Sequence, residues 1–174
     1  MCKGKCLPHP KSPTPPTATW EAPPLGWIKL NVDAALSESS FALAVVARNS
    51  SGSVIKVWTK LHIRCPPLVA EASAILWAVQ LAHQENWNHI IIEGDAKNGI
   101  DPLALENAIP DWSIVNIISS ILNFKTSFLG CLFRWVKKNS DVAAHAAAKL
   151  SLRAKEPLCF KKDNLPEALV SACR

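Results

Sequence analysis

Hydrophobic positions in the first third of the chain fall into short runs that predict β-strands. Residues 27–33 alternate apolar and polar side chains imperfectly, and their β-branched content favours a strand. Residues 41–48 and 54–61 follow as two further strands, joined by a turn at residues 49–52 in which Gly52 can accept a positive φ. Short connections of this kind predict an antiparallel meander of three strands.

The pattern changes after Pro66 and Pro67, where apolar spacing and residue type predict helices alternating with strands. Residues 69–84 are rich in Ala and Leu and lack Gly and Pro, which favours a helix. The solid apolar run at 87–93 predicts a strand that is buried on both faces. Further along, the pattern predicts helices at 96–105, at 111–124 with Asp111 as N-cap, and at 140–155, with a strand at 128–136.

This order of elements predicts an α/β fold with a mixed five-stranded sheet flanked by helices. Residues 1–25 are rich in proline and predict a leader without regular hydrogen-bonded structure. The folded domain is expected over residues 26–155. From residue 156 onward the sequence shows no clear periodicity, so 156–174 is expected to be a C-terminal tail.

Composition and charge narrow the class of protein. The 174 residues are 49% hydrophobic, enough for a proper core, and no apolar stretch is long enough to predict a membrane span or a secretory signal. The six scattered cysteines indicate reduced thiols, and Cys2, Cys6 and His9 lack the fourth ligand of a zinc knuckle. We therefore expect an intracellular monomer, and the sequence does not distinguish between the nucleus and the cytoplasm as its location.

The net charge of +5 is unevenly distributed. Residues 68–111 hold seven acids and one base, Lys97, whereas residues 125–162 hold nine bases and two acids. This bipolar pattern suits a protein that holds cations at one patch and a polyanion such as nucleic acid at another, although charged stretches are also common on solvated helices.

Three acids stand at the edges of apolar segments, where a strand or helix begins or ends. Asp33 closes the first strand, Glu71 opens the first helix, and Asp95 follows the isoleucine run. Ligands collect at strand ends in such sheets, and three like charges in one cleft repel each other unless cations neutralise them. Oxygen ligands favour Mg²⁺ or Mn²⁺ over zinc.

Four segments of the chain resemble successive signatures of a known family. WIKLNVDAA, AEASAILWAVQLA, IIIEGDAKNGI and FRWVKKNSDVAAHAAAKLS, with the lead-in WEAPPLGW, are similar to ribonuclease H-like domains, above all the plant retroelement-derived, reverse-transcriptase-like type. The resemblance implies cleavage of the RNA strand of an RNA–DNA hybrid with two metal ions. It places Asp33, Glu71 and Asp95 at the family's first three metal-binding acids.

The fourth position departs from the cellular enzymes of this family. His145 stands where those enzymes carry an aspartate, and an imidazole can bind a metal or shuttle a proton but adds no negative charge. Asp141, four residues earlier, either supplies that carboxylate, orients the imidazole, or only caps the helix. Ala34 and residues 41–44 replace glycines usual in the family, and their methyl groups could obstruct a nucleic-acid backbone.

Three further residues are candidates for contact with nucleic acid. Lys137 and Lys138 lie in the loop that leads to the closing helix and are placed for phosphate contacts, while the loop lacks the histidine that many relatives carry. Asn98 either contacts a sugar or backbone or is a solvent-exposed helix residue.

Three functions therefore remain open on the sequence. The first is an active hybrid-specific ribonuclease, and the second is a binding module of the same fold that has lost turnover. The third is a protein-interaction domain that uses the proline-rich leader.

Overall fold

The computed structural model describes residues 20–138 and 142–173 and confirms the antiparallel meander. Its strands are β1 (Ile28–Leu36), β2 (Ser40–Arg48) and β3 (Val54–Ile63). The turn between β2 and β3 is closed by the Asn49 side chain, which accepts hydrogen bonds from the backbone N–H groups of Ser51 and Ser53. Gly52 adopts a φ of 79°, which is costly for residues with a Cβ.

The remaining strands extend the meander into a mixed sheet on both sides. β4 (His89–Gly94) pairs parallel with β1, and β5 (Gly130–Trp135) pairs parallel with β4. A sixth strand, β6 (Cys159–Lys161), pairs antiparallel with β3. The order β5-β4-β1-β2-β3-β6 thus contains one strand more than the sequence predicts.

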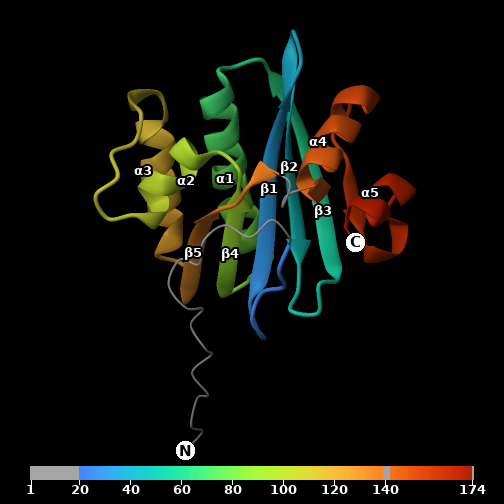
Figure 1. Cartoon of the computed structure of the whole chain (residues 1–174), viewed down its shortest axis with the longest axis horizontal. Helices are drawn as coiled ribbons and strands as arrows, with labels where there is room; N and C mark the ends of the chain where they lie inside the picture. Colours follow the sequence, from blue (N-terminus) through green and yellow to red (C-terminus); the bar gives the residue numbers. More distant parts are fainter. Residues whose placement is uncertain (1–19, 139–141, 174) are drawn as a thin grey trace, which may run out of the picture.

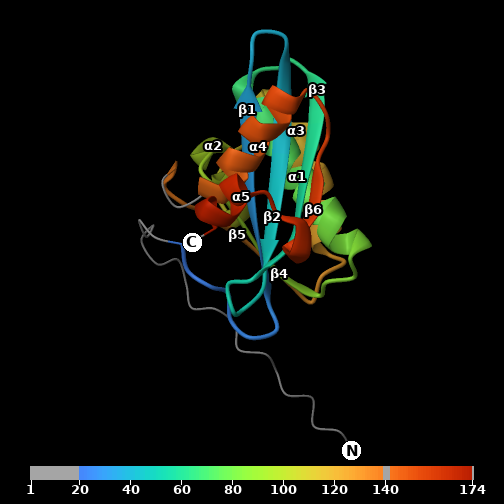
Figure 2. The same ribbon diagram turned by 90° about the vertical axis from the view of Figure 1, so that its right-hand side faces the viewer.

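Helices cover both faces of this sheet (Figure 1, Figure 2). α1, α2 and α3 pack on one face over a core of leucine, isoleucine and valine side chains, and α4 and α5 pack on the other over a smaller, alanine-rich core. Within residues 20–138 and 142–173 the helices are α1 (Pro67–Gln84), α2 (Lys97–Ala104), α3 (Val115–Lys125), α4 (Val142–Ala154) and α5 (Glu167–Ala172), with the short 3-10 helices η1 (Trp112–Ile114) and η3 (Lys162–Asn164).

Three predicted boundaries need correction. β1 continues past Asp33 to Leu36, because Ala34–Leu36 pair with β2, so Asp33 lies inside the strand. α1 begins at Pro67, where a proline is favoured, and Glu71 therefore lies just beyond its first turn. Asp111 does cap a helix by accepting from the Ser113 N–H, but that helix is η1, which precedes α3.

The segment predicted as a C-terminal tail is folded onto the domain. Besides its pairing with β3, it is anchored where Leu158 N–H donates to the Thr59 hydroxyl at 2.7 Å. Leu169 of α5 is buried in the core beneath α4. These contacts are long-range, so they cannot be predicted from local periodicity in the sequence.

Two other expectations concern the ends and the apolar surface of the chain. Most of the proline-rich leader, residues 1–19, lies outside the described residues, whereas Trp20 and Glu21 contact strand β1. Among the described helices, none has both the length and the hydrophobicity to cross a membrane.

Replacing Leu169 with alanine tests whether the C-terminal segment belongs to the folded unit. The variant removes a side chain that is 1% exposed, and the free energy of unfolding should fall by about 2–4 kcal/mol. Urea denaturation followed by circular dichroism measures this loss. Val170→Ala, at a half-buried position of the same helix, is the control, and an equal effect of the two variants would argue against a buried anchor.

Candidate metal centre

Three acids from separate elements converge at one point beside the central strand. Asp33 comes from β1, Glu71 from α1, and Asp95 follows the end of β4. One carboxylate oxygen of each lies within 4.8 Å of the others. The structure thus brings together the three residues that the sequence singles out.

The parallel pairing of β1 and β4 explains why the acids meet here. Its last paired residues are Asn31 and Glu93, and each acid follows two residues later on its strand. Asp33 therefore leaves the β4 ladder while it is still paired with Ala44 of β2. The acids therefore lie where the two strands separate.

The position of Asp95 is fixed through its backbone. Trp135 of β5 donates its indole N–H to the Asp95 carbonyl at 2.9 Å, and Val136 N–H donates to the Gly94 carbonyl at 3.0 Å. A Cβ at Gly94 would lie 3.1 Å from a methyl group of Val32, so glycine allows β4 to pass close to β1. These contacts hold the residue at the cleft.

Burial and the neighbouring carboxylates disfavour ionisation of Asp33 and Glu71. Desolvation raises the pKa of Asp33, an effect that the hydrogen bond and charge of His145 partly oppose. The pKa of Glu71 is raised to about 8, first by burial and then by the charges of Asp33 and Asp95, while Lys138 lowers it. Without a compensating charge, this site retains a proton near neutral pH.

A divalent cation fits this donor set. The three side chains offer only hard oxygen ligands, which suit Mg²⁺, Mn²⁺ or Ca²⁺ and not the nitrogen and sulfur sites typical of zinc. A cation would also relieve the repulsion that raises the pKa of Glu71.

His145 approaches the acids from α4, on the sheet face opposite α1. Its Nδ1 donates to the Oδ2 atom of Asp33 at 2.7 Å, and its side chain is 34% exposed. The predicted fourth position thus contacts the first acid directly. Asp141 lies outside the described residues, so its suggested role stays a prediction.

The candidate nucleic-acid contacts are distributed unevenly around the cleft. Lys137 and Lys138 are exposed after β5, and Lys138 lies near enough to Glu71 to lower the pKa of its carboxyl. Asn98 is exposed on α2, where it lines a hollow with Asp101 and Asp111. That hollow is not lined by the three acids.

The residues that replace the expected glycines do not project into the cleft. Ala34 and Phe41 are buried in the core beneath α1, and Ala42 and Ala44 are buried in the core beneath α4. Their side chains are accommodated by packing. Obstruction of a nucleic-acid backbone by these methyl groups, which the sequence suggests, is not supported.

One group of buried polar residues beside the acids was not predicted. Lys29, Asn31 and Glu93 are each at most 5% exposed, and Trp20 of the lead-in segment contacts Lys29 and Asn31. A signal exists in the sequence, since residues 29, 31 and 33 alternate and must share one face of β1. Alternation alone does not reveal that another segment covers this face.

Comparisons with known proteins agree with this architecture. The model of a family described as reverse transcriptase-like matches residues 31–151. Solved structures similar to the chain include RNase H1 from the archaeon Halobacterium salinarum, at 18% identity and a TM-score of 0.68, covering 74% of this chain and 98% of that one. A search of curated proteins gave no match.

Two further structures show the same fold. An N-terminal RNase H domain from Mycobacterium tuberculosis aligns at 12% identity with a TM-score of 0.66, covering 74% of this chain and 94% of that one. LC11-RNase H1, solved in complex with an RNA/DNA hybrid, aligns at 12% identity with a TM-score of 0.62, covering 72% of this chain and 99% of that one. At these identities the likeness establishes the fold.

The raised pKa of Glu71 predicts a pH-dependent stability in the absence of metal. The folded state holds a proton that the unfolded state has lost between the ordinary pKa of 4.5 and about 8, so unfolding becomes easier as the pH rises through this window. Glu71→Gln should be more stable than the parent by roughly 2 kcal/mol near pH 8, allowing for partial solvent screening.

Urea denaturation in EDTA across this pH range measures the difference between the two proteins. Below the low end of the window, where Glu71 is protonated in both states, the difference should nearly vanish. A difference that does not change with pH would show that Glu71 ionises as freely as an exposed glutamate.

Proposed function

Because the chain belongs to the reverse transcriptase-like family, we propose that it is a metal-dependent ribonuclease that cleaves the RNA strand of RNA–DNA hybrids. The observation that carries this proposal is the convergence of Asp33, Glu71 and Asp95 within 4.8 Å of one another. The RNase H1 neighbours of the fold, one of them solved with a hybrid, support the choice of substrate. The motifs of the sequence support an origin in a plant retroelement.

The acids are proposed to hold two Mg²⁺ or Mn²⁺ ions. Asp33 on the central strand β1, Glu71 on α1 and Asp95 after β4 are the residues that would hold these ions. When bound, the ions would supply an activated water for in-line attack and stabilisation of the departing 3′ oxygen. The protein contributes placement and negative charge.

His145 acts on the site through Asp33. Its hydrogen bond to Oδ2 engages one oxygen of the Asp33 carboxylate and so limits the rotation of that group. Because the imidazole adds no negative charge, the second ion should be held less tightly than by a fourth carboxylate.

Substrate contact is proposed for exposed groups beside the cleft. Lys137 and Lys138 follow β5 directly and can contact phosphate oxygens, which positions the backbone without reading sequence. Asn98 is offered as a contact for a sugar hydroxyl or phosphate. We propose that the domain works as a monomer.

A second candidate is a binding module of the same fold with little or no turnover. The observation that favours it is His145, which lies against Asp33 where a fourth acid would otherwise contribute charge. Such a module would retain hybrid binding through its basic residues. Hybrid binding without cleavage by the parent chain would support this alternative.

The substitution Asp95→Asn tests both the proposed ribonuclease activity and its dependence on the acid cluster. The purified chain should cleave the RNA strand of a labelled RNA–DNA hybrid in Mg²⁺ or Mn²⁺, and Asp95→Asn should lower the rate at least about 100-fold, since it removes a charged ligand but keeps the size of the side chain. Gel analysis of the labelled RNA gives both rates.

Asp101→Asn is the matched control for this experiment. Asp101 is an acid of the neighbouring helix α2 that pairs with Lys97 and is not among the three clustered acids. Its replacement should leave the cleavage rate near that of the parent. Equal rates for the parent and Asp95→Asn would contradict the proposed function.

Replacing His145 with aspartate tests the consequence of the missing charge. His145→Asp should lower the Mg²⁺ concentration required for half-maximal cleavage by about tenfold, because a fourth carboxylate strengthens the binding of the second ion. A metal titration of the rate measures this shift, with His145→Ala as the control that removes the imidazole without adding charge. An unchanged metal requirement in His145→Asp would mean that this position does not contribute to metal binding.

A further inference from the structure

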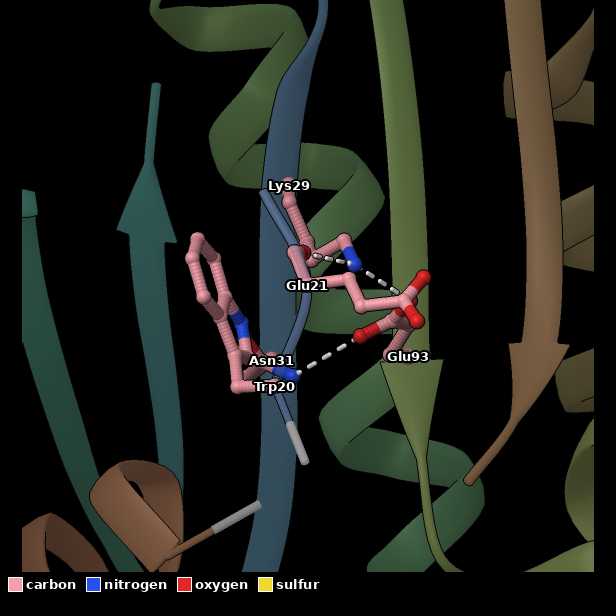
Figure 3. Close-up of polar contacts among 5 residues, drawn as sticks. All are labelled: Trp20, Glu21, Lys29, Asn31 and Glu93. Carbon is pink, nitrogen blue, oxygen red and sulfur yellow. Dashed lines mark hydrogen bonds and ion pairs between the residues drawn. The ribbon is translucent and has the colours of Figure 1, made fainter. Parts of the chain in front are cut away.

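A buried polar cluster lies on the sheet directly beside the three acids. Its members are Lys29 and Asn31 of β1, Glu93 of β4, and Trp20 and Glu21 of the lead-in segment, which runs along β1 (Figure 3). Lys29, Asn31 and Glu93 are 2%, 1% and 5% exposed. This degree of burial is unusual for a lysine and a glutamate.

Glu93 joins the two strands through both of its carboxylate oxygens. Lys29 Nζ lies 2.7 Å from Oε1, and the Asn31 amide donates to Oε2 at 3.3 Å. Asn31 and Glu93 also form the last paired position of the parallel ladder. The side-chain bridge therefore sits at the point where β1 and β4 separate.

Trp20 closes the cluster from outside the sheet. Its indole N–H donates to the Asn31 side-chain oxygen at 2.8 Å, which leaves the amide nitrogen directed to Glu93. The Lys29 ammonium lies 5.2 Å from the centre of the indole ring and the Arg48 guanidinium lies 4.5 Å from it. Lys29 also donates to the backbone carbonyl of Glu21 at 2.5 Å.

A contribution to the stability of the fold does not by itself explain why charged residues are buried at these positions. Removing a lysine and a glutamate from water costs several kcal/mol, and well-packed apolar side chains at the same positions are often as stable or more so. What the charged pair adds is a fixed geometry, since its hydrogen bonds are directional and an apolar contact is not. That geometry is imposed two residues before both Asp33 and Asp95.

We propose that Trp20, Asn31 and Glu93 are positioning residues for the metal centre, acting through the separation of β1 and β4. The cluster holds the last rung of the ladder at one spacing and thereby sets the distance between the Asp33 and Asp95 carboxylates. Lys29 neutralises Glu93, so the bridge adds no net charge beside the acids. This inference rests on the proposed metal site.

Mn²⁺ binding by the parent chain and by Trp20→Phe provides the test. The phenylalanine retains an aromatic ring against Lys29 and Arg48 but cannot donate to Asn31. Isothermal titration calorimetry with Mn²⁺ alone, without nucleic acid, should show an affinity lowered by about tenfold, the size of effect typical of groups that orient metal ligands. Glu93→Gln, which breaks the ion pair, should lower it at least as far.

Lys56→Gln is the matched control because it breaks a similar pair elsewhere. Lys56 Nζ lies 2.7 Å from Glu85 Oε1 and 4.9 Å from the centre of the Trp58 ring, at the C-terminal end of α1 and so away from Glu71. Its melting temperature should fall while its Mn²⁺ affinity stays at the parent value. Melting curves of all variants separate loss of fold from loss of geometry.

The outcomes distinguish the inference from the function on which it rests. Parent-like Mn²⁺ affinity in Trp20→Phe and Glu93→Gln would overturn the positioning role and leave the metal site intact. An equal loss in Lys56→Gln would also overturn it, because general destabilisation would then be the cause. No Mn²⁺ binding by the parent chain would overturn the proposed metal site and this inference with it.

Discussion

Mutual repulsion among three carboxylates in a partly buried cleft is the interaction on which the rest of the structure depends. The energy of three like charges rises steeply as water is excluded, and the pKa of Glu71 is raised first by its burial and then by the charges of Asp33 and Asp95. A flexible chain would let the acids move apart. Here each acid is carried by an element that packs on its neighbours, so the acids cannot reduce their repulsion by moving apart. A bound cation would reduce that repulsion, and the site therefore favours cations.

The two hydrophobic cores each hold in place one helix that brings a side chain to the acid cluster. The core beneath α1 fixes the helix that carries Glu71, and the core beneath α4 fixes the helix that brings His145 to Asp33. The second core is built largely from alanine, which allows α4 to approach the sheet closely. A close approach is what lets a side chain as short as histidine contact a carboxylate on the central strand.

The sequence predicted the fold well because the fold depends on local signals, and it singled out three acids that the structure brings together. Alternation revealed the meander, and alanine-rich spacing revealed α1 and α4. The predicted sheet lacked one strand, β6. This strand has only three residues, and it pairs with β3 across about a hundred residues of sequence, so no periodic pattern of apolar residues predicts it. The buried cluster was missed for the same reason, since polar residues such as Lys29 and Asn31 normally mark a solvated face.

Strand β6 has a consequence for how the protein behaves in concentrated solution. It occupies the hydrogen-bonding edge of β3 at Lys56, Val57 and Trp58, where bare backbone groups could otherwise pair with a strand of another molecule. The remaining length of that edge carries Lys60, and Arg64 follows it, and such charges discourage pairing between copies. The C-terminal segment thus protects the sheet from edge-to-edge aggregation, a role independent of any chemistry at the acids.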